Sequence, residues 1–148
     1  MSLEENKAIV RSWIESYNKH NLDSVDEFLA PDFIDHVHHG GPEGVKQVFN
    51  MAFSAFPDWH ESIEEMIAEG DTVWARLTYT GTHTGEFFGL PATGNKITAT
   101  AVAMYRIVDG KLVEGRFITD SLDMNKQTGA IEVTEKGKAL FPEDTDNS

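Results

Sequence analysis

The sequence contains no cysteine. Disulfide bonds, thiolate metal sites and cysteine nucleophiles are therefore excluded. No apolar run approaches the ~20 residues that a membrane-spanning helix needs. The Gly-x-Ser-x-Gly motif of serine hydrolases, the P-loop and a Gly-x-Gly-x-x-Gly stretch after a strand are also missing. These absences argue against a serine nucleophile and against a nucleotide site built on these motifs.

Basic residues are scarce. Twelve Lys and Arg stand against 25 Asp and Glu, which gives a formal net charge of −13. Such a field repels nucleic acids and anionic membranes, so neither is an expected partner, and it leaves a small molecule open. The first residues lack the basic and apolar regions of a signal peptide, which predicts a cytoplasmic location.

The length and composition are those of one globular domain. A chain of 148 residues can bury a real core, and 40% hydrophobic with 25% charged residues is ordinary. We expect a single domain over residues 1–132 and a polar C-terminal tail over residues 133–148. The last part of this tail, residues 143–148, is predicted to fray.

The first third of the sequence has helical periodicity. Ser2 and Glu5 form a capping-box pattern, and apolar residues at helical spacing predict a helix to about His20. A short second helix is predicted over 21–29 and a third over 42–56, with Pro42 in its first turn. Between them, residues 33–39 are predicted to be extended.

The period then changes to two. Strands are predicted over 60–68, 72–83, 96–108 and 111–122, with an Asp109-Gly110 hairpin turn before the last. Helices followed by strands indicate an α+β fold. We expect a curved antiparallel or mixed sheet, wrapped as a cone around three helices, with a cavity suited to a small molecule.

The last predicted strand carries charge on a half-apolar face. Residues two apart share a face, so one face is expected to carry Leu112, Glu114, Arg116, Ile118, Asp120 and Leu122. That pattern is typical of a pocket lining. Glu114 lies ~20 Å from Asp120 along a strand, too far for a catalytic carboxyl pair. Arg116, at ~13 Å, can reach only an anionic end of a substrate.

Several segments together resemble one family. They are residues 30–36 (Ala-Pro-Asp-Phe-Ile-Asp-His), 53–58, 69–73, 81–94 (beginning Gly-Thr-His-Thr-Gly), 106–114, 120–122 and 127–129. In order and spacing they resemble the SnoaL-like polyketide cyclase (ester cyclase) family, within the larger NTF2-like group of cone-shaped folds that includes ketosteroid isomerase.

The resemblance implies a homodimer, no metal and no cofactor. It implies that Asp120 is the acid/base group of an intramolecular aldol ring closure, and it places His36 at a family motif position. The function expected is acid/base catalysis on a small carbonyl compound, by cyclisation, isomerisation or dehydration. Many relatives have Trp where this chain has Arg116, which predicts a more polar pocket here.

Asp120 and His36 are the catalytic candidates. A carboxyl group transfers protons effectively when its pKa lies near the working pH, and burial in an apolar cone can supply that shift. The alternative for Asp120 is a cap that accepts hydrogen bonds from nearby backbone amides. An imidazole can polarise a carbonyl, so His36 is a candidate too. Its alternative role is to tie its segment to a backbone carbonyl.

Four further residues are predicted to contact substrate: Tyr17, Arg76, His83 and Arg116. Each has an alternative. His83 can hold the long loop that follows it, and Arg76 can form an ion pair. Tyr17 can belong to the core, or present its hydroxyl to the cavity.

Six histidines also raise the possibility of a metal site. His36 and His38 would share a face if their segment were extended, and His60 or His83 could complete the site. No carboxylate falls at a recognised metal spacing, and His38 is expected to be exposed beside a Gly-Gly turn. A metal site is therefore not expected.

Two functions remain open, an enzyme and a non-catalytic module that binds the same kind of small molecule. A dimer is expected on separate grounds. Ala99, Ala101, Ala103 and Tyr105 alternate on one face of a strand, and we expect this face to need a cover.

Overall fold

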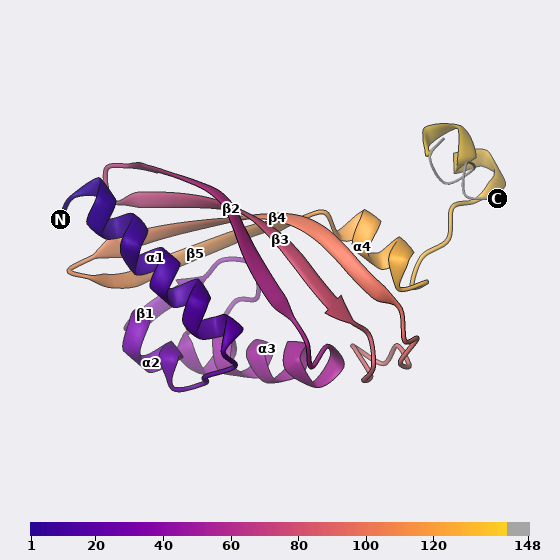
Figure 1. Ribbon diagram of the computed structural model, residues 1–148, viewed down its shortest axis with the longest axis horizontal. Helices are drawn as coiled ribbons and strands as arrows, with labels where there is room; N and C mark the ends of the chain where they lie inside the picture. Colours follow the sequence, from indigo (N-terminus) through magenta and orange to yellow (C-terminus); the bar gives the residue numbers. More distant parts are fainter. Residues whose placement is uncertain (142–148) are drawn as a thin grey trace.

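The protein is a curved five-stranded sheet with three helices on one side. The computed structural model describes residues 1–141, and the residues predicted to fray lie outside this range (Figure 1). The elements are α1 (Leu3–Asn18), α2 (Ser24–Phe28), β1 (Leu29–Asp35), α3 (Pro42–Ala55), β2 (His60–Glu69), β3 (Thr72–Thr82), β4 (Lys96–Val108), β5 (Lys111–Thr119), α4 (Ser121–Gln127) and a 3-10 helix (Glu135–Leu140).

The strand order is β1-β5-β4-β3-β2. β1 runs parallel to β5, and the other neighbours are antiparallel. In Figure 1, α1 lies across the strands, and α2 and α3 lie beyond it on the same side, while α4 follows β5 at the opposite end of the sheet from the N-terminus. The expected α+β architecture, a mixed curved sheet around three N-terminal helices, is confirmed.

Local signals explain where the elements begin. The predicted capping box is present: Ser2 accepts from the backbone N–H of Glu5, and the Glu5 side chain accepts from Ser2. Pro42 occupies the first turn of α3. Asp109 and Gly110 both have positive φ angles, as a tight hairpin between β4 and β5 requires.

A β-bulge reverses the predicted faces of β5. Arg106 of β4 pairs with Glu114 and Ile107 pairs with Leu112, so Val113 is an extra residue. One extra residue shifts the two-residue alternation by one position. Beyond it, Gly115, Phe117 and Thr119 take the inner face, and the outer face carries Glu114, Arg116 and Ile118. The prediction that this second set lines the pocket is wrong.

Other predicted boundaries also differ. α2 is shorter than predicted, and β1 begins at Leu29 rather than at 33. β5 ends at Thr119 rather than at 122, because Asp120 is the N-cap of α4. Residues 36–39 form a turn rather than an extended segment. The Asp35 side chain accepts hydrogen bonds from the backbone N–H groups of Val37 and His38, which offers the chain a turn in place of a strand.

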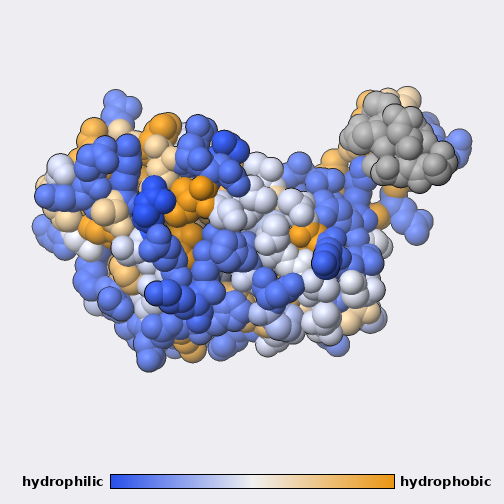
Figure 2. All heavy atoms as spheres, viewed as in Figure 1, coloured by the Kyte–Doolittle hydropathy of each residue, from blue (hydrophilic) through white to orange (hydrophobic). Residues whose placement is uncertain are grey.

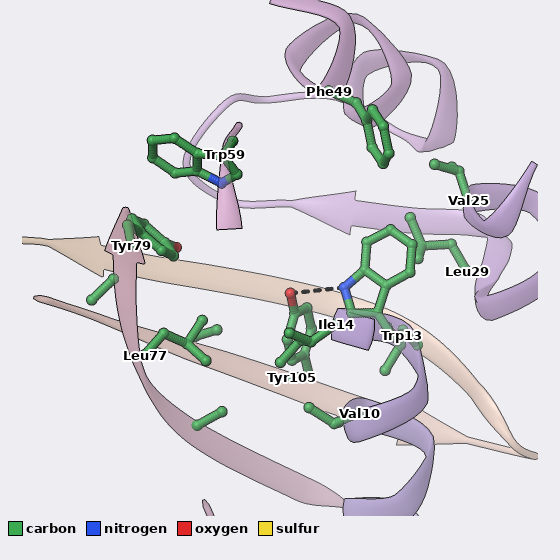
Figure 3. Packing of buried hydrophobic residues seen from close by; sticks show 14 of the residues in the cluster. Val10, Trp13, Ile14, Val25, Leu29, Phe49, Trp59, Leu77, Tyr79 and Tyr105 are labelled. Carbon is green, nitrogen blue, oxygen red and sulfur yellow. Dashed lines mark hydrogen bonds between the residues drawn. The ribbon is translucent and has the colours of Figure 1, made fainter. Parts of the chain in front are cut away.

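The core lies between α1–α3 and the inner face of the sheet. Ala99, Ala101 and Ala103 are buried there with Val10 and Ile14 of α1. Figure 3 shows these two α1 side chains beside the strands. The alanine face is thus covered by the chain's own helices, and its predicted need for a partner is wrong.

The outer face of the sheet is exposed and mixed in character. Ile67, Trp74 and Ile118 are 64%, 48% and 66% exposed. In the view of Figure 2 the surface is largely hydrophilic, with hydrophobic side chains in separate patches. Over residues 1–141, none of the helices has the length and apolar character to span a membrane.

Candidate active site

A cavity of about 290 Å³ opens between the helices and one end of the inner sheet face. Aromatic side chains form much of its wall, contributed by Trp13, Tyr17, Phe33, Trp59, Tyr79, Phe87, Tyr105 and Phe117. Figure 3 shows Trp13 and Tyr105 on one side of this region and Trp59 and Tyr79 on another. Ser121, Met124 and Asn125 bring the start of α4 to its rim. Such a lining suits a flat, largely apolar ligand.

Glu61 is a carboxyl group inside this aromatic wall. It lies near the start of β2, directly opposite Tyr79 of β3, and its side chain is partly buried. Asn18 fixes its backbone with two hydrogen bonds of 2.8 Å, and Trp59 Nε1 donates to Oε1 at 3.4 Å. Burial raises the pKa of Glu61 to about 7, because an apolar environment disfavours the charged form. Glu61 can therefore accept and return a proton at neutral pH.

Three tyrosines surround the cavity with phenol groups that stay protonated. Burial raises the pKa of Tyr17, Tyr79 and Tyr105 above the usual value, and the nearby Glu61 raises each further. Trp13 Nε1 donates a hydrogen bond to Tyr105 Oη at 3.0 Å. Because an indole only donates, the Tyr105 hydroxyl keeps its own hydrogen for another acceptor.

A buried aspartate paired with an exposed histidine forms another part of the wall. Asp35 is 4% exposed, and its Oδ2 lies 2.8 Å from His38 Nδ1. Burial favours the neutral acid, but hydrogen bonds from the His38 side chain and from backbone N–H groups outweigh this effect and lower the pKa of Asp35. The same bond raises the pKa of His38.

The two predicted catalytic residues lie outside the cavity lining. Asp120 is exposed, and its side chain accepts from the backbone N–H of Asp123, as a helix cap does. Its neighbours Thr119 and Ser121 line the cavity instead. His36 Nε2 lies 3.6 Å from Glu114 Oε2, in a contact with the outer face of β5.

Among the four predicted substrate contacts, Tyr17 lines the cavity and the others do not. His83 is fully buried, with Nδ1 3.0 Å from Thr93 Oγ1, so it holds the loop that follows β3. Arg76 is exposed and pairs with Glu65 at 3.3 Å. Arg116 lies on the outer face of β5, so it adds no polarity to the pocket.

The histidines do not converge on a metal. Within residues 1–141, no three His, Asp or Glu side chains are placed to hold a metal ion together. The turn at 36–39 is the reason His36 and His38 do not share a face.

Sequence reasoning missed Glu61 and the Asp35–His38 pair. Glu61 shares its side of the strand with Ile63, but an extra residue at Glu64 interrupts the alternation of β2 and hides the pattern. For the pair, the available signal was Asp35 three residues before His38, a spacing that lets a carboxylate start a turn and meet a side chain beyond it.

Comparison with known proteins agrees with this fold. The model of the SnoaL-like polyketide cyclase family matches residues 7–128. The aklanonic acid methyl ester cyclase DauD of Streptomyces sp. strain C5 is 31% identical over 137 residues, covering 87% of this chain and 84% of the relative. The nogalonic acid methyl ester cyclase of Streptomyces nogalater is 30% identical over 122 residues, covering 78% and 91%.

Solved structures share the architecture. AclR of Streptomyces galilaeus, a proposed hydroxylase, superimposes with a TM-score of 0.82 at 26% identity, covering 96% of this chain and 97% of that one. IdmH of Streptomyces antibioticus, a proposed polyketide cyclase, gives 0.75 at 29% identity, covering 84% and 98%. Because different activities are assigned to one fold, the sequence relatives carry the assignment. The chain belongs to the SnoaL-like polyketide cyclase family and is a cyclase-type protein.

Proposed function

We propose that this protein closes a ring in a small carbonyl compound by cofactor-free acid/base catalysis, with Glu61 as the proton-transfer group. The observation that carries the proposal is the Glu61 carboxyl group, with its pKa raised to about 7, in the wall of a cavity lined by aromatic side chains. A base with such a pKa is half ionised at neutral pH, where it can both remove and return a proton.

The reaction is an intramolecular aldol addition. The Glu61 carboxylate removes a proton from a carbon next to a carbonyl group. The resulting carbanion attacks a second carbonyl carbon of the same molecule, which forms a carbon–carbon bond and an alkoxide. Glu61 then returns its proton to the alkoxide oxygen. The product is an isomer of the substrate, so no co-reactant is consumed.

The cavity wall supplies binding and orientation. Aromatic side chains favour a planar substrate, and holding two reacting groups of one molecule close together lowers the entropic part of the barrier. Trp13 fixes Tyr105, whose hydroxyl hydrogen is available to a carbonyl oxygen. Tyr17 and Tyr79 both line the wall near Glu61, which supports a substrate-positioning role for Tyr17 as well.

Relatives suggest the first substrate to try. Two cyclases similar to this chain are named for aklanonic acid methyl ester and nogalonic acid methyl ester. A cavity of about 290 Å³ lies at the lower end of the usual range for ligand sites. We therefore infer that a fused-ring ester would place its reacting end in the cavity and the remainder past α4.

The family resemblance instead assigns proton transfer to Asp120, and that role stays a prediction. Ring closure of aklanonic acid methyl ester by Glu61→Gln, Asp120→Asn and the unaltered protein separates the two. We expect Glu61→Gln to lose at least ~100-fold in kcat. Asp120→Asn keeps the cap of α4, because Asn caps helices as well as Asp does, and we expect less than ~10-fold change. The opposite ranking would overturn the role of Glu61.

A non-catalytic binding module is the second candidate. The same aromatic wall would hold the ligand, and Glu61 would only orient it. In that case the unaltered protein binds the methyl ester, and chromatography detects no cyclised product at any pH between 6 and 8. Isomerisation and dehydration, which begin with the same proton removal, would appear in that assay as different products.

The expected homodimer would use the outer face of the sheet. Ile67 pairs with Trp74, Trp74 with Met104, and Val102 with Ile118, so exposed apolar side chains lie on neighbouring strands. Such a patch supports association. Sedimentation at micromolar concentration tests it: we expect a dimer, and a monomer for Trp74→Glu. The cytoplasmic location remains a prediction, which cell fractionation tests.

A further inference from the structure

Within residues 1–141, His38 is the one side chain lining the cavity that can carry positive charge. Among the described residues that line the cavity, Asp35 and Glu61 are acidic, and none is Lys or Arg. A side chain that can be cationic stands out here, because the whole chain has a net charge of −13. A cationic hydrogen-bond donor in this wall favours a ligand that carries an anionic group.

Asp35 holds the imidazole in place. Oδ1 of Asp35 accepts hydrogen bonds from the backbone N–H groups of Val37 at 2.8 Å and His38 at 2.9 Å, and Oδ2 meets His38 Nδ1 at 2.8 Å. Both carboxylate oxygens are thus occupied, and the turn that carries the ring is fixed by the same residue. In this arrangement Asp35 is a positioning residue for His38.

The second ring nitrogen is left for a ligand. Within residues 1–141, His38 Nε2 makes no hydrogen bond, and the side chain is 44% exposed. The ring lies against Phe117, with centroids 6.2 Å apart, and Phe117 lies 5.7 Å from Tyr105. The imidazole therefore lies next to the aromatic side chains of the cavity wall.

We propose that His38, positioned by Asp35, binds a carboxylate carried by the aromatic ligand of the cavity. A protonated imidazole donates from both nitrogens, so with Nδ1 bonded to Asp35, Nε2–H remains for an acceptor on the ligand. Hydrogen bonds between charged partners are shorter and stronger than neutral ones. The inference rests on the proposed function only in taking the cavity as the ligand site.

The pH dependence must be separated from that of Glu61. The titratable groups in the wall come from several elements: Tyr17 of α1, Asp35 of β1, Glu61 of β2, Tyr79 of β3 and Tyr105 of β4. Glu61 gains negative charge over the range in which His38 loses its proton, and both changes weaken anion binding. A Glu61→Gln background removes the first change.

The test compares an acid with its uncharged ester. Binding of 2-naphthoate and of methyl 2-naphthoate is measured by titration calorimetry at pH 6. The proteins are the unaltered chain, His38→Gln, Asp35→Asn and the control His60→Gln, whose histidine is exposed at the start of β2. We expect about tenfold tighter binding of naphthoate than of the ester by the unaltered protein and by the control. His38→Gln is expected to bind the two compounds equally.

Two further measurements distinguish recognition from a structural role. Asp35→Asn is expected to weaken naphthoate binding more than ester binding. In the Glu61→Gln background, the preference for naphthoate should disappear between pH 6 and pH 9, while ester affinity stays constant. Equal binding of acid and ester by the unaltered protein, or a preference that survives in His38→Gln, overturns the proposal.

Failure here leaves the proposed function to its own test. If neither compound binds, carboxylate recognition is overturned along with a naphthalene-sized ligand site. The turnover of Glu61→Gln on the methyl ester still decides the role of Glu61 in ring closure.

Discussion

The inner and outer faces of the sheet give the same types of side chain different properties. On the inner face, Glu61 is surrounded by aromatic rings and has its pKa raised to about 7. On the outer face, Glu65 is 67% exposed and forms an ion pair with Arg76. The two glutamates are four residues apart on one strand. Their surroundings, rather than their chemical type, decide which one can transfer protons at neutral pH.

The largest effect expected from this contrast is on catalysis. Replacing Glu61 with Gln removes the proton-transfer group and keeps the shape of the side chain, so we expect kcat to fall by ~10²–10⁴-fold. Glu64→Gln, on the same strand and exposed, is the matched control and should retain activity. If Glu61→Gln and Glu64→Gln lowered kcat equally, the position of Glu61 in the cavity wall would not matter for catalysis.

The buried carboxyl group should also affect stability. The folded-state pKa of about 7 lies above the unfolded value of ~4.3, so the folded protein holds a proton that the unfolded chain releases. Stability is then fully present below about pH 4 and is lost as the pH rises through 7. We expect the unaltered protein to lose up to about 3 kcal/mol relative to Glu61→Gln between pH 4 and pH 8.

Urea unfolding of both proteins across this range measures the difference. The pKa of His38 is raised too, so its contribution also falls with rising pH, but it is common to both proteins and cancels. A difference that does not vary with pH would mean that Glu61 has the same pKa in the folded and unfolded states, which contradicts the raised pKa expected from burial.

A smaller effect is expected at Tyr105. Tyr105→Phe keeps the ring and removes the acceptor of the Trp13 indole N–H, which leaves a buried donor unpaired. We expect a loss of ~1–3 kcal/mol in the free energy of unfolding. Tyr79→Phe, also on the inner face, removes no such partner from Trp13 and should cost less in the same urea experiment.

The smallest effect is expected on the outer face. Arg76→Ala breaks the exposed ion pair with Glu65, and such pairs contribute ~0–1 kcal/mol. The change in the urea midpoint should be within this range and should shrink further in 0.5 M salt. A loss as large as that of Tyr105→Phe would remove the energetic distinction between the faces.

Elements with a strong local signal could be predicted from the sequence. The capping box of α1, Pro42 at the start of α3 and the Asp109-Gly110 turn each act through neighbouring residues, and each lies where it was expected. The stretches with two-residue periodicity predicted the strands from β2 to β5, because this alternation is also a local pattern. The motif segments led to the family, and the family model agrees.

The site was predicted less well, because its residues depend on register. Val113 and Glu64 are the extra residues of two bulges, and each reverses which side of its strand faces the helices. Asp120 follows the bulge in β5 and became a helix cap. Glu61 precedes the bulge in β2 and faces the cavity. No local pattern in the sequence marks either bulge.

By itself, the sequence determined the class of fold, the order of its helices and strands as far as β5, and the family; α4 and the 3-10 helix that follow were not predicted. The fold class and this order follow from short-range periodicity and from turn and capping residues, which act over a few positions. The family follows from the resemblance of the motif segments. Only the tertiary structure decided which carboxyl group and which histidine meet the aromatic wall. That choice depends on pairing between strands and on burial, and a single extra residue in a strand is enough to move a charge from one face of the sheet to the other.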